Sequence, residues 1–152
     1  MSAAEQREPQ HARVLRDSRP GDLALVFSSW LGSDAFSRAG QACARVYKRE
    51  HERVVRAIIE RPGVIIRVAC CPDDEDAILG WACIQPGTEA VCFYVYVKKG
   101  VREDGIARDL LGEMASQHVE YTHQPVRHFK DKRPPPGWVY CPYRNHTPRL
   151  AP

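Results

Sequence analysis

The chain has 152 residues, of which 43% are hydrophobic and 27% are charged, and its formal net charge is +3. This length fits one domain with a hydrophobic core, and the composition is that of a globular protein rather than a disordered one. No apolar stretch approaches the ~20 residues that span a bilayer, and residues 1–11 lack the apolar core of a secretory signal, so we expect them to form a disordered lead-in.

A short strand and a helix are predicted next. Val14-Leu15-Arg16 fits a strand, and Pro20-Gly21-Asp22 follows it closely. Asp22 is the expected N-cap of a helix, because apolar residues at helical spacing come directly after it. These apolar residues are Leu23, Val26, Phe27 and Trp30. Gly32-Ser33-Asp34 is expected to end the helix.

A second helix is predicted over about residues 41–61, and Pro62-Gly63 ends it. Its apolar positions are Tyr47, Val54, Val55, Ile58 and Ile59. Charged residues fill the remaining positions. They are most simply a solvated face, and a basic binding helix is the alternative.

Three strands are predicted after the second helix, over residues 64–71, 77–84 and 90–97. An acidic turn at residues 72–76 and a short loop at residues 85–89 separate them. Such short connections predict antiparallel neighbours. Because the strands are apolar on both faces, we expect a sheet that is covered on both sides.

The six cysteines show no C-x-x-C pair. They are Cys43, Cys70, Cys71, Cys83, Cys92 and Cys141. Four of them fall in the predicted strands, so we expect free buried thiols in a reducing compartment, which predicts a cytoplasmic protein.

A turn with small residues follows the last predicted strand. Five residues after Val97 the chain reads Arg102-x-x-Gly105-x-Ala107, and a helical apolar pattern begins at Ile106. This pattern predicts a helix to about Val119. A turn of this kind points several backbone N–H groups in one direction, where a pyrophosphate would bind. The alternative is an ordinary connection between a strand and a helix.

This stretch resembles the GNAT superfamily of N-acetyltransferases, in which an Arg/Gln-x-x-Gly-x-Gly/Ala turn after the fourth strand binds the pyrophosphate of acetyl-CoA. Arg102, Gly105 and Ala107 fall on its three defining positions. The resemblance covers about residues 12–120. It implies an α+β fold with a mixed, mostly antiparallel sheet flanked by helices, in the order β-α-α-β-β-β-α, followed by an irregular C-terminal segment.

The resemblance also implies a cofactor site for acetyl-CoA as co-substrate. The strand residues Val95, Tyr96 and Val97 would lend backbone hydrogen bonds to the pantetheine arm. The turn residues Arg102, Glu103, Asp104, Gly105, Ile106 and Ala107 would hold the pyrophosphate. Glu103 and Asp104 oppose this role, since two carboxylates repel a phosphate unless their side chains point to solvent. Lys98 and Lys99 partly offset them.

An N-acetyltransferase transfers acetyl to a primary amine by direct attack on the thioester, and it benefits from a general base. Glu89, at the start of the motif strand, is the candidate base. Tyr94 or Cys92 could face the acceptor, although these two could share a face and simply pack. Tyr140 is a candidate acid for the departing thiolate, with Tyr121 and Tyr143 as substitutes.

Residues 121–152 depart from the family pattern. They contain seven prolines and form a basic segment with short strands expected at residues 126–129 and 138–141. Its charges are Arg127, Lys130, Lys132, Arg133, Arg144 and Arg149 against Asp131. The segment could bind a protein partner, which is the second hypothesis: a GNAT-fold protein without catalysis. Nucleic-acid binding is a weaker option, and no membrane partner is expected.

A zinc site is disfavoured. The candidate ligands are His118, His123, His128, Cys141 and His146, and they lack the closely spaced ligand pairs of structural zinc sites. We therefore expect no metal. A hydrolase with a Cys–His pair has no support either, because no cysteine is flagged as activated.

Overall fold

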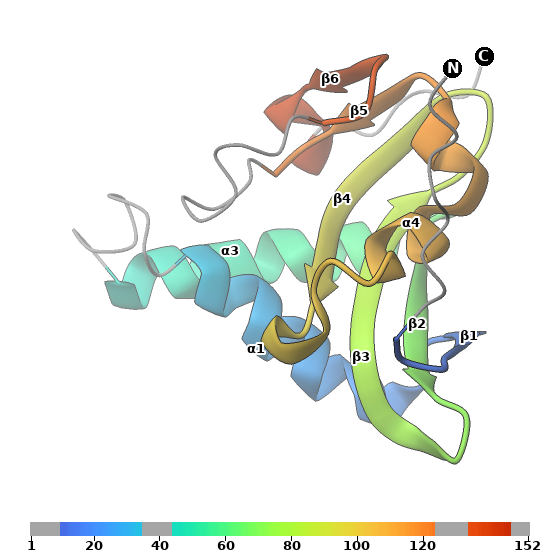
Figure 1. Ribbon diagram of the computed structural model, residues 1–152. Helices are drawn as coiled ribbons and strands as arrows, with labels where there is room; N and C mark the ends of the chain where they lie inside the picture. Colours follow the sequence, from blue (N-terminus) through green and yellow to red (C-terminus); the bar gives the residue numbers. More distant parts are fainter. Residues whose placement is uncertain (1–9, 35–43, 124–133, 147–152) are drawn as a thin grey trace.

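A six-stranded sheet forms the centre of the molecule, and its strands lie in chain order across the sheet (Figure 1). The computed structural model describes residues 10–34, 44–123 and 134–146. The strands are β1 (Val14–Asp17), β2 (Ile65–Cys71), β3 (Asp74–Gln85), β4 (Ala90–Val97), β5 (Val119–Tyr121) and β6 (Trp138–Tyr140). Neighbours from β1 to β4 are antiparallel, whereas β5 is parallel to β4 and β6 is parallel to β5. The predicted mixed, mostly antiparallel sheet is confirmed.

Helices cover both faces of this sheet (Figure 1). Helices α1 (Leu23–Asp34) and α3 (Ala44–Ile59) lie on one face, and α4 (Ile106–Leu111) lies on the other. The predicted α+β class and the order β-α-α-β-β-β-α are therefore confirmed. The C-terminal segment adds β5 and β6 to the sheet.

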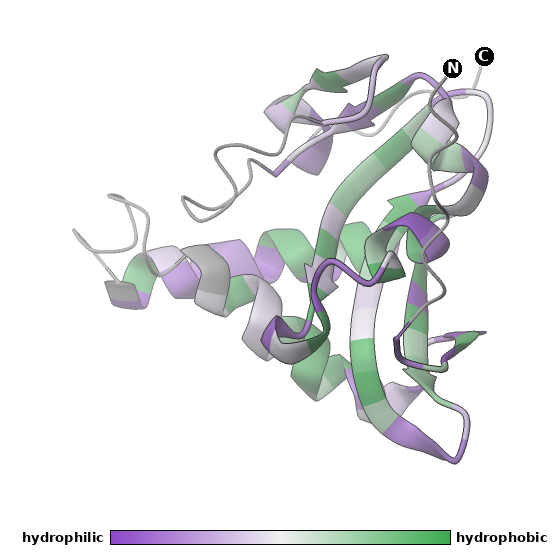
Figure 2. Cartoon of the chain, viewed as in Figure 1, coloured by the Kyte–Doolittle hydropathy of each residue, from purple (hydrophilic) through white to green (hydrophobic). Residues whose placement is uncertain are grey.

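Two hydrophobic clusters hold the layers together, one on each face of the sheet. The cluster under α1 and α3 centres on Trp81 and Phe93, which are 0% and 1% exposed. The cluster under α4 includes Ile84 and Leu110, both 0% exposed. Figure 2 shows the apolar strands between these layers and the hydrophilic hairpin tip between β2 and β3. Burial on both faces explains why the strands are nearly continuous apolar runs.

The last predicted helix is shorter than expected. A helix to about Val119 is wrong, because α4 ends at Leu111 and a 3-10 turn follows at Gly112–Ser116. Gly112 has a φ of 56°, a left-handed backbone that ends an α-helix. Val119 instead begins β5, so the chain returns to the sheet earlier than the apolar spacing indicates.

Asp22 is not the N-cap that its position in the sequence predicts. Pro20–Asp22 forms a 3-10 turn, and the Asp22 carboxylate accepts a backbone hydrogen bond from Arg19 (2.7 Å). It also accepts two hydrogen bonds from the Arg16 guanidinium, at 2.6 and 3.1 Å. The carboxylate thus joins the end of β1 to the start of α1.

The acidic turn between β2 and β3 is also shorter than predicted, because β3 begins at Asp74. Asp74, Glu75 and Asp76, which the sequence places in the turn, belong to this strand, and Glu75 is contacted by arginines in and after β1. The Glu75 carboxylate pairs with Arg19, and the backbone carbonyl of Glu75 accepts a hydrogen bond from the Arg16 side chain (2.9 Å).

The described C-terminal residues dock against the rest of the fold. The predicted strand near Trp138 is confirmed as β6, whereas the one expected at residues 126–129 lies outside the described residues. Arg61 donates to the carbonyls of Arg144 (2.6 Å) and Asn145 (2.5 Å). Arg144 in turn pairs with Glu120 of β5 at 2.6 Å.

Candidate functional site

The turn that follows β4 has an unusual backbone. Glu103 and Gly105 have φ angles of 71° and 79°, so two left-handed residues stand within three positions, and both are exposed. The Arg102 side chain donates from Nε to the carbonyl of Val97 (3.0 Å), which fixes where the turn leaves the strand. The first helical hydrogen bond runs from Asp109 to Gly105 (3.1 Å). The N–H groups of Ile106 and Ala107 therefore have no acceptor within α4.

The two acidic residues of this turn have different surroundings. The Glu103 side chain is in an exposed position, but the side chain of Asp104 is only 8% exposed. Its carboxylate accepts backbone hydrogen bonds from Gln10 (2.7 Å) and His11 (3.0 Å), and it pairs with Arg13 at 2.9 Å. The backbone hydrogen bonds lower the pKa of Asp104, chiefly the one from Gln10, with smaller contributions from the His11 side chain and the charge of Arg13. Asp104 thus points at the N-terminal segment rather than at solvent.

The second half of β4 has an open edge. The Lys98 N–H donates to the carbonyl of Leu79 (2.8 Å). Because bonded pairs alternate in an antiparallel ladder, the backbone groups of Val95 and Val97 face away from β3. On that side β5 pairs with β4 only from Ala90 to Cys92, and no described strand pairs beyond that point. Residues Val95–Val97 are accordingly half-buried, whereas the earlier residues of β4 are buried.

A β-bulge interrupts β4 just where this open edge begins. Cys83 pairs with Tyr94 and Ile84 pairs with Cys92, so Phe93 is the extra residue. The bulge places Cys92 in the cluster under α4 and Tyr94 in the cluster under α1 and α3. The interpretation that these two side chains share a face is therefore wrong, since simple alternation does not hold across a bulge.

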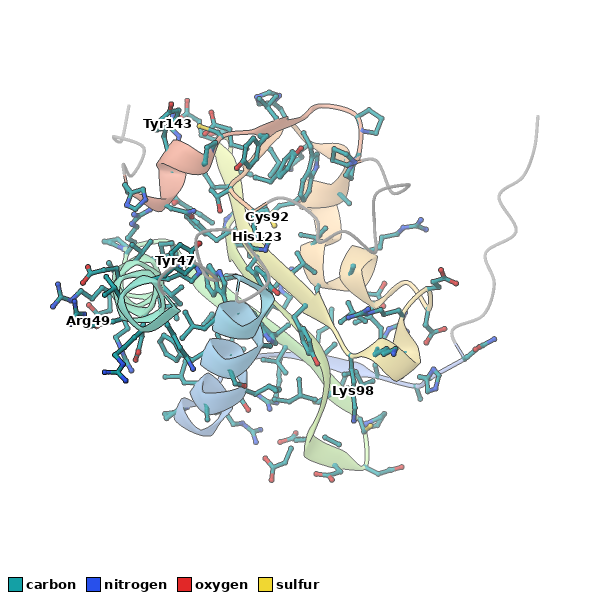
Figure 3. All side chains as sticks on the ribbon, turned by 90° about the vertical axis from the view of Figure 1, so that its left-hand side faces the viewer. Tyr47, Arg49, Cys92, Lys98, His123 and Tyr143 are labelled. Atoms are coloured by element: carbon teal, nitrogen blue, oxygen red, sulfur yellow. The ribbon has the colours of Figure 1, made fainter. Side chains whose placement is uncertain are left out.

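Tyr94 lies in an aromatic cluster on the α1 face. Its ring stacks on Trp30 and Trp81, with centroids 5.3 and 5.1 Å away, and its hydroxyl lies 3.4 Å from the carbonyl of Ser29. His123 meets the edge of the ring at 4.7 Å. The N–H of Thr122, one residue before His123, donates to the carbonyl of Cys92 (3.1 Å), so His123 stands where β5 leaves β4 (Figure 3).

Cys92 is not an activated thiol. It is 5% exposed, and burial raises the pKa of its thiol to about 12. It also lies on the α4 face, away from Tyr94. It can therefore neither present a thiolate at neutral pH nor face the same acceptor as Tyr94.

Cys92 is expected to resist alkylation in the native protein, because a buried thiol with a raised pKa carries almost no thiolate. Treatment with iodoacetamide at pH 8 followed by mass spectrometry measures this directly. Cys71 and Cys141, which are half-buried, serve as internal controls and should be modified first. Fast modification of Cys92 without denaturant would contradict the burial described above.

The remaining candidate catalytic residues are not gathered around the turn. Glu89 is exposed in the loop before β4, beside a pocket of about 500 Å³ lined by Gly87, Thr88, Gln117 and His118. Tyr140, 42% exposed, contacts the ring of Tyr121, which packs on the α4 side of the sheet. Tyr94 faces the opposite side. The structure thus places Glu89 at the far end of β4 from the turn, and Tyr94 and Tyr140 on opposite faces.

The zinc candidates do not form a metal site among the residues that the structure describes. No group of three or more His, Cys, Asp or Glu side chains is arranged there to hold an ion, and His128 lies outside the described residues. Within the same residues, no helix has both the length and the apolar character needed to cross a membrane.

Two residues, Arg13 and His123, lie at the turn or the open edge, but no sequence pattern predicts that they do. Arg13 reaches the turn from 91 residues away, and no local pattern marks such a contact. His123 is distinguished in the sequence only by its spacing to other histidines. Its position next to Tyr94 depends on where β5 pairs with β4.

No protein-family model matches the chain, and no curated protein matches it. Several solved structures are similar to it. A protein from Pyrococcus furiosus, provisionally described as an acetyl transferase, has a TM-score of 0.54 at 17% identity, covering 79% of this chain and 88% of that one. The histone acetyltransferase HPA2 and related acetyltransferase from Corynebacterium glutamicum has a TM-score of 0.51 at 14% identity, covering 74% and 78%. At such identities the likeness shows the fold alone, and the chain has a GNAT-like fold.

Proposed function

We propose that this protein is an acetyl-CoA-dependent N-acetyltransferase, which transfers the acetyl group to a primary amine by direct attack. The observation that carries the proposal is the position of the exposed left-handed turn at Glu103–Gly105. It lies directly after the strand edge that β5 leaves open. The edge provides outward-facing strand-type hydrogen-bonding groups, and the turn provides N–H groups for a diphosphate.

The described residues fit such a cofactor. The outward backbone groups of Val95 and the N–H of Val97 would hold the amide groups of the pantetheine arm as an added strand would, whereas the Val97 carbonyl already accepts from Arg102. The N–H groups of Ile106 and Ala107 would bind the pyrophosphate. Gly105 has no side chain to block the approach, and the Asp104 carboxylate is paired with Arg13, which also pairs with Asp109. The bound thioester would supply an activated acetyl group.

The acceptor amine must be neutral to attack. A lysine amine with a pKa of ~10.4 is neutral in only about one part in 2,500 at pH 7, so a base that takes its proton raises the rate. We assign this role to Glu89, which is exposed in the loop just before β4 and would take the proton through a water molecule. Tyr94 would face the acceptor from the α1 side, whereas Tyr140 lies on the opposite face of the sheet and is not assigned the role of the acid.

Turnover with a panel of primary amines tests the proposal. Purified protein and acetyl-CoA should release free CoA in the presence of an accepted amine, whether a small molecule or a protein. Glu89→Gln should lower kcat/KM by about 100-fold, the usual contribution of a general base. Glu113→Gln, another exposed carboxylate near the sheet, is the matched control and should leave the rate unchanged.

A catalytically inactive protein that binds a protein partner is the alternative. The separation of Glu89, Tyr94 and Tyr140 in the fold favours it, because a catalytic set is normally gathered around one substrate. Binding of acetyl-CoA without turnover of any amine in the panel would support this alternative over the enzyme.

A further inference from the structure

The N-terminal segment before β1 is bound to the turn through one side chain. Arg13, whose side chain is only 9% exposed, uses all three of its guanidinium nitrogens. Nε donates to the carboxylate of Asp109 (2.6 Å), one terminal nitrogen to the carboxylate of Asp104 (2.9 Å), and the other to the carbonyl of Asp104 (2.8 Å). Arg13 therefore contacts the side chain and the backbone of Asp104 in the turn, and the side chain of Asp109 in α4.

These contacts bear on the conformation of the turn. The carbonyl that Arg13 holds belongs to Asp104, which stands between the two left-handed residues Glu103 and Gly105. A residue other than glycine in this conformation costs about 1 kcal/mol or more and persists only when its surroundings hold it. The planar fork of an arginine suits this task, because it fixes several acceptors at once.

The contacts of Arg13 also offset negative charge in the turn. An unpaired Asp104 carboxylate would stand in the same turn as the proposed diphosphate site, and like charges repel at this range. Arg13, the backbone N–H groups of Gln10 and His11, and the His11 ring all contact this carboxylate. Asp104, which opposes phosphate binding when considered alone, is therefore compatible with it once Arg13 is in place, and Glu103 is in an exposed position.

We infer that Arg13 is a positioning residue of the cofactor site, which holds the Glu103–Gly105 turn in its left-handed conformation and offsets part of the negative charge of Asp104. This inference rests on the proposed function for the identity of the ligand. It assigns to the segment before β1 a part in cofactor binding.

A double-mutant cycle with acetyl-CoA as the probe tests the inference. Arg13→Met should weaken acetyl-CoA binding by about tenfold, measured by isothermal titration calorimetry, because Asp104 is left unpaired beside the phosphates. Asp104→Asn alone should change binding little. The double variant should bind more tightly than Arg13→Met, because it no longer carries the unpaired carboxylate. Melting temperatures of the same three variants separate this role from a purely structural one, which predicts that affinity falls and recovers only together with stability.

Arg16→Met is the matched control. Arg16 lies in β1, three residues after Arg13, and its side chain is 12% exposed. It pairs with Asp22, away from the turn. Its loss should lower the melting temperature and leave the acetyl-CoA affinity unchanged. If Arg13→Met does not fold, Arg13→Gln takes its place, since it also removes the charge and keeps an amide that can donate hydrogen bonds.

The outcomes separate this inference from the proposed function. If the wild-type protein binds acetyl-CoA and Arg13→Met binds it equally well, Arg13 has no positioning role and the proposed function stands. If Arg13→Met binds weakly but Asp104→Asn does not rescue it, the charge role of Arg13 is wrong. If the wild-type protein does not bind acetyl-CoA at millimolar concentration, both the proposed function and this role are overturned.

Discussion

Replacing Gly105 with glutamate is expected to abolish acetyl-CoA binding while the protein remains folded. Gly105 is exposed and adopts a φ of 79° at the start of α4. A glutamate there adds a negative charge and bulk where the diphosphate must approach, so we expect affinity to fall by at least about 100-fold. A Cβ at this position would lie 3.5 Å from the nearest atom of Arg13, so the side chain has room and the fold should persist.

Two matched variants separate the causes of this loss. Gly105→Gln has almost the same bulk without the charge, and Gly105→Ala has the backbone strain alone, about 1 to 2 kcal/mol. We expect alanine to weaken binding least and glutamate to weaken it most, with melting temperatures that are similar for all three. Normal binding of acetyl-CoA by Gly105→Glu would show that the site is assigned to the wrong turn.

Replacing Asp22 with alanine is expected to cost about 3 kcal/mol of unfolding free energy, because it leaves the charge of Arg16 unpaired in a largely buried position. Asp22 is 6% exposed and accepts three hydrogen bonds, two from Arg16 and one from the backbone of Arg19. Urea denaturation followed by the fluorescence of the buried Trp30 and Trp81 measures this loss. A change of less than about 1 kcal/mol would mean that water replaces the carboxylate without cost.

The pH dependence of this loss has a definite sign. The hydrogen bonds from Arg16, more than any other cause, lower the pKa of Asp22 in the folded state. A carboxyl with a lowered pKa stabilises the fold above its unfolded pKa of ~3.9, and this contribution disappears as the pH falls through the folded pKa. The difference between wild type and Asp22→Ala should therefore be constant from pH 5 to pH 7 and shrink below about pH 4. A difference that grows in acid would contradict this pairing.

Much of the fold could be predicted because its signals are local. The bounds of β4 at Ala90–Val97, the order of the elements and the double-sided burial all follow from short apolar runs and the turns between them. The end of α4 could not be placed, because Met114 and Ala115 continue the apolar spacing after Gly112 has already turned the chain. A glycine inside a helical pattern is often tolerated, so it does not by itself predict an end.

Less of the candidate site than of the fold could be predicted from the sequence. The turn at Arg102–Ala107 is visible in the sequence, since its small residues and its position after a strand are local. The bulge at Phe93 is not, because it adds no turn residue and changes only which face each side chain takes. The pairing of Arg13 with Asp104 spans 91 residues, and so two acids that stand next to each other in the sequence have opposite surroundings in the structure.

Hydrogen–deuterium exchange with and without acetyl-CoA tests the central claim most directly, because it reports the backbone groups themselves. Saturating cofactor should slow the exchange of the amides in Val95–Val97 and Gly105–Ala107, and it should leave those of the β2–β3 hairpin tip unchanged. Exchange at both segments that is unaffected by millimolar acetyl-CoA would contradict the account, since the open strand edge and the turn would then not form its binding site.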